Sequence, residues 1–243
     1  QRVEQILRSS HVDALTKDLN LISKDNITIV GSNLKAAGNT TLKAVNDINV
    51  IAGVNELLTQ VASSKSGFFS GGDFYSKQKN IKTTQQQSVV QSQLEGNNVT
   101  LKSGQDINLV GTNAKAKDQL NLSGQNIRIA SAEQITTTQQ QKYKMDVSFG
   151  DVAKTLKRPD KMVQYDNGKL TSRIAKAELD DSRESTSTTT QVGSQLSAKN
   201  ININAKSQQK GEGNILIQGS NLDAQKDINL NASNNITIEE AIE

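Results

Sequence analysis

The sequence predicts an all-β fold in which very short strands wind into a coil, and two observations support this prediction. Between residues 98 and 130, pairs of aliphatic residues alternate with single polar residues, as in Val99-Thr100-Leu101 and Ile107-Asn108-Leu109. Such alternation is typical of an extended chain that buries one of its two sides. In addition, Ile107 and Ile127 lie 20 residues apart and each follows an Asn or Asp. Short strands that recur at this period are expected to stack turn upon turn.

The same layout occurs twice more, once near each end of the chain. Residues 26–53 and residues 214–241 repeat the pattern of short alternating cores separated by turn-forming residues. Internal repeats of this kind indicate that each copy buries its core against its neighbours. A glycine, a hydroxyl residue and an asparagine mark the same position in all three copies: Gly31-Ser32-Asn33, Gly111-Thr112-Asn113 and Gly219-Ser220-Asn221.

The composition fits a narrow core better than a globular one. Hydrophobic residues make up 34% and aromatic residues only 3% of the chain, which is too little to fill a wide core. Regularly spaced Ile, Leu and Val can instead form a thin core of about six turns, roughly 30 Å long at ~4.8 Å per turn. Parallel crossovers are almost always right-handed, which predicts the hand of the coil. The lack of cysteine excludes disulfides and thiolate metal sites, and a net charge of +3 does not require a nucleic-acid partner.

Taken in order, the chain is expected to be a single elongated domain, a piece of a longer protein, with two interruptions. Residues 1–10 form a lead-in that we expect to be helical. Three coil segments follow, at about residues 12–53, 92–132 and 193–243. Between them, two excursions at about residues 55–91 and 133–192 break the period.

Both excursions are rich in Ser, Thr, Gln and Lys and are expected to leave the coil as antiparallel hairpins. The first has polar arms on either side of the glycine-rich run from Gly67 to Gly72, a pattern typical of a hairpin. The second has matching Thr- and Gln-rich arms at residues 135–143 and 185–191. Between these arms, the sequence predicts a short helix near residues 151–158 and a turn at Asn167-Gly168.

The spacing of the isoleucines predicts how successive turns lie over one another. An isoleucine that follows Asn or Asp recurs after 20 or 21 residues in every copy. Stacking such positions builds a continuous core, because the same residue type meets its equivalent turn after turn. The expected inward-facing pairs are Ile27 on Ile48, Ile107 on Ile127, and Ile215 on Ile236.

The Asn or Asp before each of these isoleucines is expected to form a structural polar ladder that binds no ion. Calcium ligation is the alternative, but the residues depart from the glycine-rich nonapeptide pattern of calcium-binding coils. Turn residues that tolerate left-handed backbone geometry explain them better. None of the expected pairs brings two carboxylates together, which would cost stability. The pairs are Asn26 over Asp47, Asp106 over Asn126, and Asn214 over Asn235.

The sequence offers little for catalysis, and we expect no enzyme activity, cofactor, metal ion or small-molecule substrate. His11 is the only histidine and lies outside any nucleophile motif. Some coiled β-proteins cleave glycans with carboxylates or basic residues grouped in a groove, so a glycan-cleaving enzyme is an alternative. Here the acidic residues are spread at about one per turn, which disfavours that alternative.

Two clusters in the excursions are candidate partner contacts. The aromatic cluster either forms an exposed tip for a partner or membrane surface, or folds against the coil. The basic cluster either lies in a solvated loop or contacts anionic lipopolysaccharide or lipid phosphate. The aromatic cluster is Phe68, Phe69, Phe74 and Tyr75, and the basic cluster is Lys154, Lys157, Arg158 and Lys161.

Three phrases carry a resemblance to a known repeat family. They are Thr188 to Leu196 (TTTQVGSQL), Gly219 to Leu222 (GSNL) and Lys65 to Gly72 (KSGFFSGG). These phrases resemble the haemagglutinin repeats of filamentous haemagglutinins and of other exoproteins of two-partner secretion, including the contact-dependent growth inhibition toxins. The resemblance covers nearly the whole chain and is specific for the repeat type.

The resemblance implies a right-handed parallel β-helix, a solenoid with two protruding antiparallel hairpins. It also implies export through an outer-membrane secretion pore of the producing cell and a secreted, cell-surface location on a Gram-negative bacterium. In growth inhibition toxins, such repeats are linked to the passage of the toxin into target cells. The implied partner is therefore the target-cell surface or outer membrane. The shaft of an adhesin without a toxin is the alternative.

Overall fold

The computed structural model describes residues 1–70, 73–149, 163–166, 169–172 and 175–242, and every regular element in these ranges is a β-strand. The all-β expectation is therefore confirmed. The described residues include no helix long and apolar enough to cross a membrane. The chain divides into two compact units. The coil unit comprises Glu4–Glu56, Gln86–Thr136 and Thr188–Glu243, and the arm unit comprises Gln1–Val3, Leu57–Gln85 and Thr137–Ser187.

The coil unit consists of successive turns, and each turn passes through three strand positions. Along these strands, buried and more exposed side chains alternate, as the period-two pattern predicts. In the last two turns, the first two positions merge into one longer strand. The turns are, in order: β2 (His11–Ala14), β3 (Leu19–Ser23) and β4 (Ile27–Val30); β5 (Asn33–Ala36), β6 (Thr40–Ala44) and β7 (Ile48–Ile51); β10 (Ser92–Gly96), β11 (Val99–Ser103) and β12 (Ile107–Val110); β13 (Thr112–Ala116), β14 (Gln119–Gly124) and β15 (Ile127–Ala130); β20 (Gln195–Ala205) and β21 (Ile215–Gln218); β22 (Asn221–Ala232) and β23 (Ile236–Glu239).

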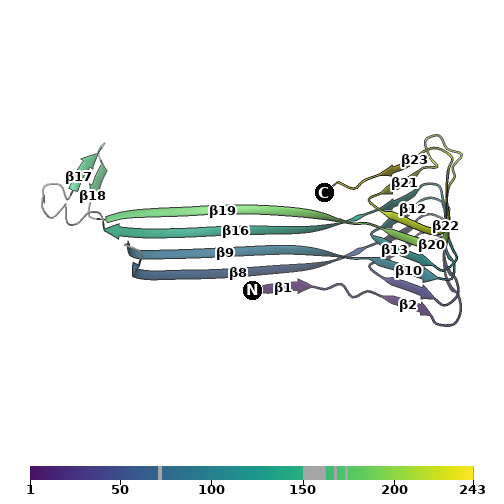
Figure 1. The fold of residues 1–243 in the computed structure, drawn as a ribbon, viewed down its shortest axis with the longest axis horizontal. Helices are drawn as coiled ribbons and strands as arrows, with labels where there is room; N and C mark the ends of the chain where they lie inside the picture. Colours follow the sequence, from purple (N-terminus) through teal and green to yellow (C-terminus); the bar gives the residue numbers. More distant parts are fainter. Residues whose placement is uncertain (71–72, 150–162, 167–168, 173–174, 243) are drawn as a thin grey trace. The chain divides into compact units, whose positions relative to one another are not determined.

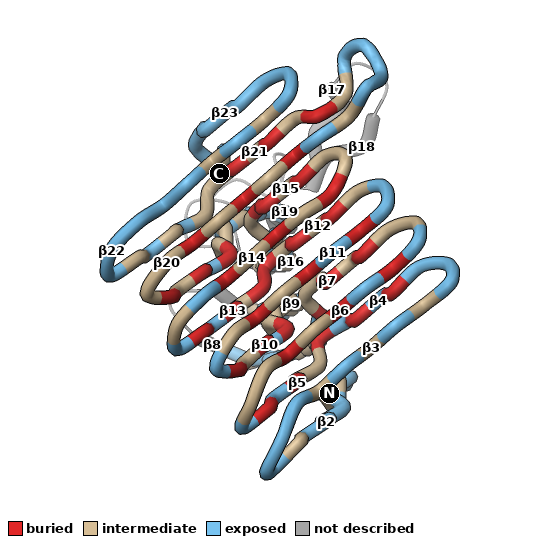
Figure 2. The backbone as a smooth tube through the Cα atoms, turned by 90° about the vertical axis from the view of Figure 1, so that its right-hand side faces the viewer, coloured by how far each residue is buried: buried red, intermediate tan, exposed pale blue. Residues whose placement is uncertain are grey.

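Equivalent strands of successive turns pair side by side in parallel. The third strands form a six-stranded sheet in the order β4-β7-β12-β15-β21-β23, and the first and second strands form a second sheet that β20 and β22 join (Figure 1). In the inner turns, buried residues recur at the same places and form continuous bands across the stack (Figure 2). Because each backbone group finds its partner in the next turn, strands of only four or five residues are stable here.

The predicted stacking of isoleucines is confirmed. Ile27 pairs with Ile48, Ile107 with Ile127, and Ile215 with Ile236. The copies also stack on one another, because β7 pairs with β12 and β15 pairs with β21. The result is one unbroken isoleucine column. The column is buried through its first five members. The expectation that Ile236 is also buried is wrong: it is 47% exposed, because no further described turn covers it.

Each excursion forms a pair of long strands, β8 with β9 and β16 with β19, and the two pairs join in a single sheet, which was not predicted from the sequence. This arm sheet has the strand order β1-β8-β9-β16-β19 (Figure 1), so the returning strand of the first excursion pairs with the outgoing strand of the second. A further antiparallel pair, β17 with β18, lies within the second excursion. The strands are β1 (Arg2–Gln5), β8 (Gly53–Ser70), β9 (Asp73–Val90), β16 (Ala132–Phe149), β17 (Val163–Asp166), β18 (Lys169–Ser172) and β19 (Ala175–Val192).

The prediction of a helical lead-in at residues 1–10 is wrong. Gln1 and Gln60 exchange two hydrogen bonds of 2.8 Å, from the amino-terminal nitrogen of Gln1 to the Gln60 carbonyl and from the Gln60 N–H to the Gln1 carbonyl. This exchange adds β1 to the free edge of β8, where an extended chain satisfies its backbone better than a short isolated helix does. The helix expected near residues 151–158 and the turn at Asn167-Gly168 lie outside the described residues.

Both excursions begin at the same corner of the coil, after the third strand of a turn. In the other turns this corner is closed by one glycine with a positive φ, at Gly31 (+51°), Gly111 (+56°) and Gly219 (+52°). The excursions follow the second and fourth turns, so their starting points are two turns apart, or about 9.6 Å at ~4.8 Å per turn. A two-stranded hairpin has about the same width. The spacing therefore explains why consecutive hairpins meet edge to edge.

Replacing residues 131–193 with a single glycine should leave a folded coil. The chain would then run Ala130-Gly-Ser194, which copies the existing corner Val110-Gly111-Thr112. Since each turn is stabilised mainly by its neighbours, we expect a strand-type circular dichroism spectrum and one cooperative melting transition. The same deletion closed with alanine should melt at a lower temperature, because the corner requires a positive φ. Loss of cooperative unfolding in the glycine variant would show that β16 and β19 belong to the folding core.

Candidate functional site

The six Asn and Asp residues singled out in the sequence lie in one column along the coil. At each step, a side-chain oxygen of one turn accepts a hydrogen bond from the backbone N–H of the equivalent residue one turn later. The column thereby gives a partner to backbone N–H groups at the turn before each third strand. The bonds run from Asp47 N to Asn26 Oδ1 (2.9 Å), Asp106 N to Asp47 Oδ1 (3.0 Å), Asn126 N to Asp106 Oδ1 (3.1 Å), Asn214 N to Asn126 Oδ1 (3.0 Å) and Asn235 N to Asn214 Oδ1 (3.2 Å).

The pairs expected from the sequence contained no Asp next to another Asp, but the structure adds one such contact. Asp47 and Asp106 are neighbours because β7 pairs with β12 across the first excursion. The backbone N–H of Asp106 donates to Asp47 Oδ1 at 3.0 Å. This donor offsets part of the repulsion between the two carboxylates, since hydrogen bonds to a charged acceptor are strong.

Two further columns of hydrogen-bonded polar residues were not predicted from the sequence. One precedes the second strands, where Asn39 N donates to Asp18 Oδ1 (2.7 Å) and Asn98 N donates to Asn39 Oδ1 (3.2 Å). The other lies at the corner, where the fully buried Ser92, Thr112 and Ser194 donate to backbone carbonyls of the third strands. Of these three residues, only Thr112 belongs to a Gly-Ser/Thr-Asn tripeptide, so the tripeptides gave only a partial signal for this corner column. All of these contacts connect coil residues to one another and are therefore structural.

Changing Asn126 to Asp should destabilise the coil at neutral pH by about 1–3 kcal/mol. The part-buried amide, which donates to two carboxylates, would be replaced by a third carboxylate beside them. The Asn126 amide nitrogen donates to Asp106 Oδ1 at 2.9 Å and to Glu212 Oε2. Urea unfolding should show the loss, and acidification should relieve part of it by removing charge. Asn235→Asp is the control. Asn235 is exposed, and its bond in the column is donated by its backbone N–H to Asn214 Oδ1, which the substitution keeps. Equal losses in the two variants would contradict the ladder interpretation.

The ladder is expected to bind no ion, and calcium provides the test. Among the described residues, no group of three or more His, Cys, Asp and Glu is placed to hold a metal ion. Millimolar calcium should therefore leave the melting temperature unchanged, because only a ligand that binds the folded state raises it. A clear rise that Asp106→Asn abolishes would identify the column as an ion site.

His11, the single histidine, lies on β2 with its Nδ1 3.4 Å from the amide nitrogen of Asn33.

The aromatic cluster lies where the first hairpin turns. Phe68 on β8 and Tyr75 on β9 face each other, with ring centroids 5.2 Å apart at 53°, and Phe68 is 68% exposed. Phe69 and Phe74 belong to the same two strands, but their side chains lie outside the described part of the structure. The basic cluster of Lys154, Lys157, Arg158 and Lys161 also lies outside the described residues.

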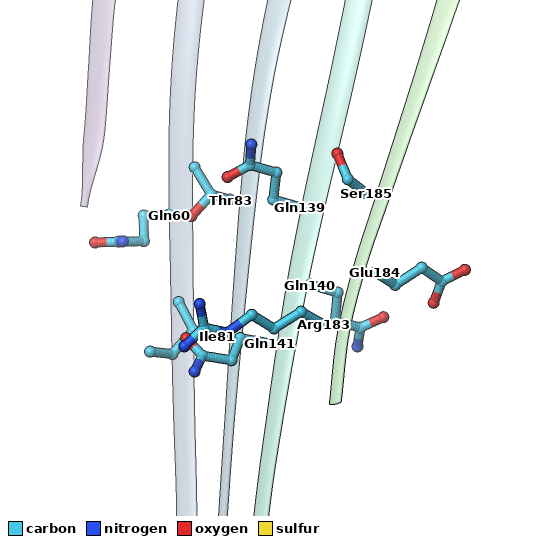
Figure 3. A pocket seen from close by; sticks show the side chains of 9 residues that line it. All are labelled: Gln60, Ile81, Thr83, Gln139, Gln140, Gln141, Arg183, Glu184 and Ser185. Atoms are coloured by element: carbon cyan, nitrogen blue, oxygen red, sulfur yellow. The ribbon is translucent and has the colours of Figure 1, made fainter. Parts of the chain in front are cut away.

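The arm sheet carries two adjoining shallow hollows. The larger, of about 470 Å³, spans four strands (Figure 3), and the smaller has a volume of about 290 Å³. Ile81 and Gln141 line both, so the two hollows form one continuous depression. The larger is lined by Gln60, Ile81, Thr83, Gln139, Gln140, Gln141, Arg183, Glu184 and Ser185, and the smaller by Lys77, Lys79, Ile81, Gln141 and Tyr143.

Two ion pairs each shift the pKa of one member. The hydrogen bond from Lys144, followed by that from Ser76, holds the pKa of the Asp146 carboxyl below its ordinary value. In the coil, the hydrogen bond to Glu95, 3.0 Å away, raises the pKa of Lys35 above its ordinary value. Lys35 is exposed and Glu95 is partly exposed, and surface pairs of this kind contribute little to stability.

Comparison with known families gives a match over almost the entire chain. The hemagglutinin repeat family matches three times, at residues 8–79, 69–157 and 175–243. Each match contains two turns of the coil and strands of the arm sheet, so the family repeat corresponds to the two-turn structural repeat. No curated protein and no solved structure matches the chain. The chain belongs to the hemagglutinin repeat family.

Proposed function

We propose that this chain is a non-catalytic structural and interaction segment of a secreted bacterial surface exoprotein, the repeat region of a contact-dependent growth inhibition toxin. In this role it helps to present the toxin or deliver it to target cells. The observation that carries the proposal is the threefold match to hemagglutinin repeats, a family of filamentous haemagglutinin-type structural segments. The polar groups of the coil are used for contacts between turns, which supports a shaft more than a catalytic groove.

The coil is best understood as a right-handed parallel β-helix. Its strands pair in parallel between successive turns, and connections between parallel strands of one sheet are right-handed in ~98% of cases. Such a stack depends on contacts between neighbouring turns and can grow one turn at a time. The chain contains no cysteine, so disulfides play no part in this folding. These properties suit a protein that passes through an outer-membrane secretion pore and folds at the cell surface of a Gram-negative bacterium.

A co-culture experiment tests this function. In the parent exoprotein, both excursions are replaced by single-glycine corners, so that the chain runs Ile51-Gly-Ser92 and Ala130-Gly-Ser194. We expect the variant to reach the cell surface, as judged by antibody labelling of intact cells, but to stop inhibiting target cells. The control replaces only residues 163–172, which span the small β17–β18 pair. Unchanged inhibition by the variant without excursions would contradict an interaction role of the arm sheet.

The alternative is the shaft of a filamentous haemagglutinin-type adhesin, which the same family match supports. An adhesin would bind target cells without inhibiting their growth. Binding of labelled exoprotein to cells, measured together with growth, separates the two functions. Binding with no inhibition under any condition would favour the adhesin.

A further inference from the structure

The two faces of the arm sheet differ in chemical character. Along a strand, alternate residues point to the same face, so Tyr75, Lys77, Lys79 and Ile81 of β9 share one face. The ring contact between Phe68 and Tyr75 places Phe68 on it as well. Tyr143 lines the same hollow as the two lysines. We call this surface, defined by Phe68, Tyr75, Lys77, Lys79, Ile81, Gln141 and Tyr143, the Lys77 face.

The cations of the Lys77 face are available to a partner. Lys77 and Lys79 are both exposed and form no ion pair with any residue in the described part of the chain. On the opposite face, polar groups contact each other: the Gln140 amide donates to Asn80 Oδ1 at 3.2 Å, and Lys144 pairs with Asp146. Arg183, at the far side of the hollow, lies 3.7 Å from Asp181. The two unpaired ammonium groups thus stand beside a hollow that Tyr143 and Gln141 also line.

The Lys77 face brings together aromatic and cationic side chains, which are the two kinds that bind a lipid surface. Positions two residues apart on a strand are about 7 Å apart, so Lys77 and Lys79 lie about 7 and 13 Å from the aromatic rung of Phe68 and Tyr75. Aromatic side chains prefer the boundary between lipid headgroups and acyl chains. Apolar surfaces that bind there enter by about 5–10 Å. On a sheet face that lies against the surface, the rings reach the headgroup boundary, and the long lysine side chains beside them reach the phosphates.

We propose that the first hairpin docks on an anionic lipid surface with its Lys77 face lying against that surface. Phe68 and Tyr75 enter the headgroup boundary, while Lys77 and Lys79 bind lipid phosphates and the hollow beside them accommodates a headgroup. The exposure of Phe68 favours lipid over a soluble polyanion, because a polyanion gives an exposed apolar ring no place to bury. This inference rests on the proposed function and names the chemistry that the arm sheet recognises on a target surface.

Vesicle sedimentation with the full chain tests the proposal. Phosphatidylcholine vesicles with and without phosphatidylglycerol are compared, and the chain should bind only the anionic ones, more weakly at high salt. The double variant Lys77→Gln/Lys79→Gln should lower the partition coefficient about 25-fold, since each lysine near a charged surface contributes roughly fivefold. Phe68→Ser should also weaken binding, at unchanged salt dependence.

The matched control is Lys82→Gln/Lys142→Gln, which removes the same charge from exposed positions on the opposite face of β9 and β16. It should change binding less than twofold, since those lysines point away from the surface. Equal weakening by both double variants would reduce the effect to net charge and overturn the proposal. So would equal binding to neutral vesicles, or none to anionic ones. Because the assay involves no toxin and no target cell, its outcome is independent of the co-culture result.

Discussion

Replacing Ile107 with Ala should lower the free energy of unfolding of the coil by about 2–5 kcal/mol, the range for truncating a fully buried aliphatic residue. Ile107 is 0% exposed and lies in the middle of the isoleucine column, paired with Ile48 on one side and Ile127 on the other. Truncation removes apolar contacts in both directions and leaves a cavity that rigid neighbouring turns cannot close. Urea denaturation followed by circular dichroism measures the loss.

Ile236→Ala provides the matched control in the same column. Ile236 has one stacked partner in the described chain, Ile215, and is 47% exposed. Its truncation should cost well under half as much, because less apolar area leaves water on folding at this position. Equal losses for the two variants would mean that the stacked core does not hold the coil together.

The second large effect is expected at the corner glycine Gly111. Its φ is +56°, and a Cβ atom there would lie 2.7 Å from Ala132 Cβ and 2.9 Å from Ala52 Cβ. Gly111→Ala should therefore cost about 1–2 kcal/mol for the left-handed backbone and about 1–3 kcal/mol more for overpacking. Thermal and urea unfolding should both show the decrease.

Gly211→Ala separates the two contributions. Gly211 also has a positive φ, +89°, but a Cβ atom there would meet nothing within 4 Å. This variant should show only the backbone cost of about 1–2 kcal/mol. If Gly111→Ala were no worse than Gly211→Ala, the close packing between neighbouring corners would be unimportant for stability.

Much of the candidate site could be predicted from local patterns. The column from Asn26 to Asn235 was visible because turn residues precede strands at a fixed spacing. The Lys77 face was not, although Lys77, Lys79 and Ile81 alternate along the sequence. Alternation shows that residues share a face, but only strand pairing shows that Tyr143 and Gln141 lie beside them.

By itself, the sequence determined the all-β character, the stacked isoleucine pairs within each copy and the equivalent positions of Gly31, Gly111 and Gly219. These features depend on short-range signals, namely the period-two pattern and a spacing near 20 residues. Only the tertiary structure decided that β9 pairs with β16, that residues 1–10 add a strand, and that Asp47 neighbours Asp106. The physical reason is that backbone hydrogen bonds between strands do not depend on which side chains the strands carry. Where excursions of unequal length interrupt the period, the pairing of strands is fixed by the stacking of the whole chain.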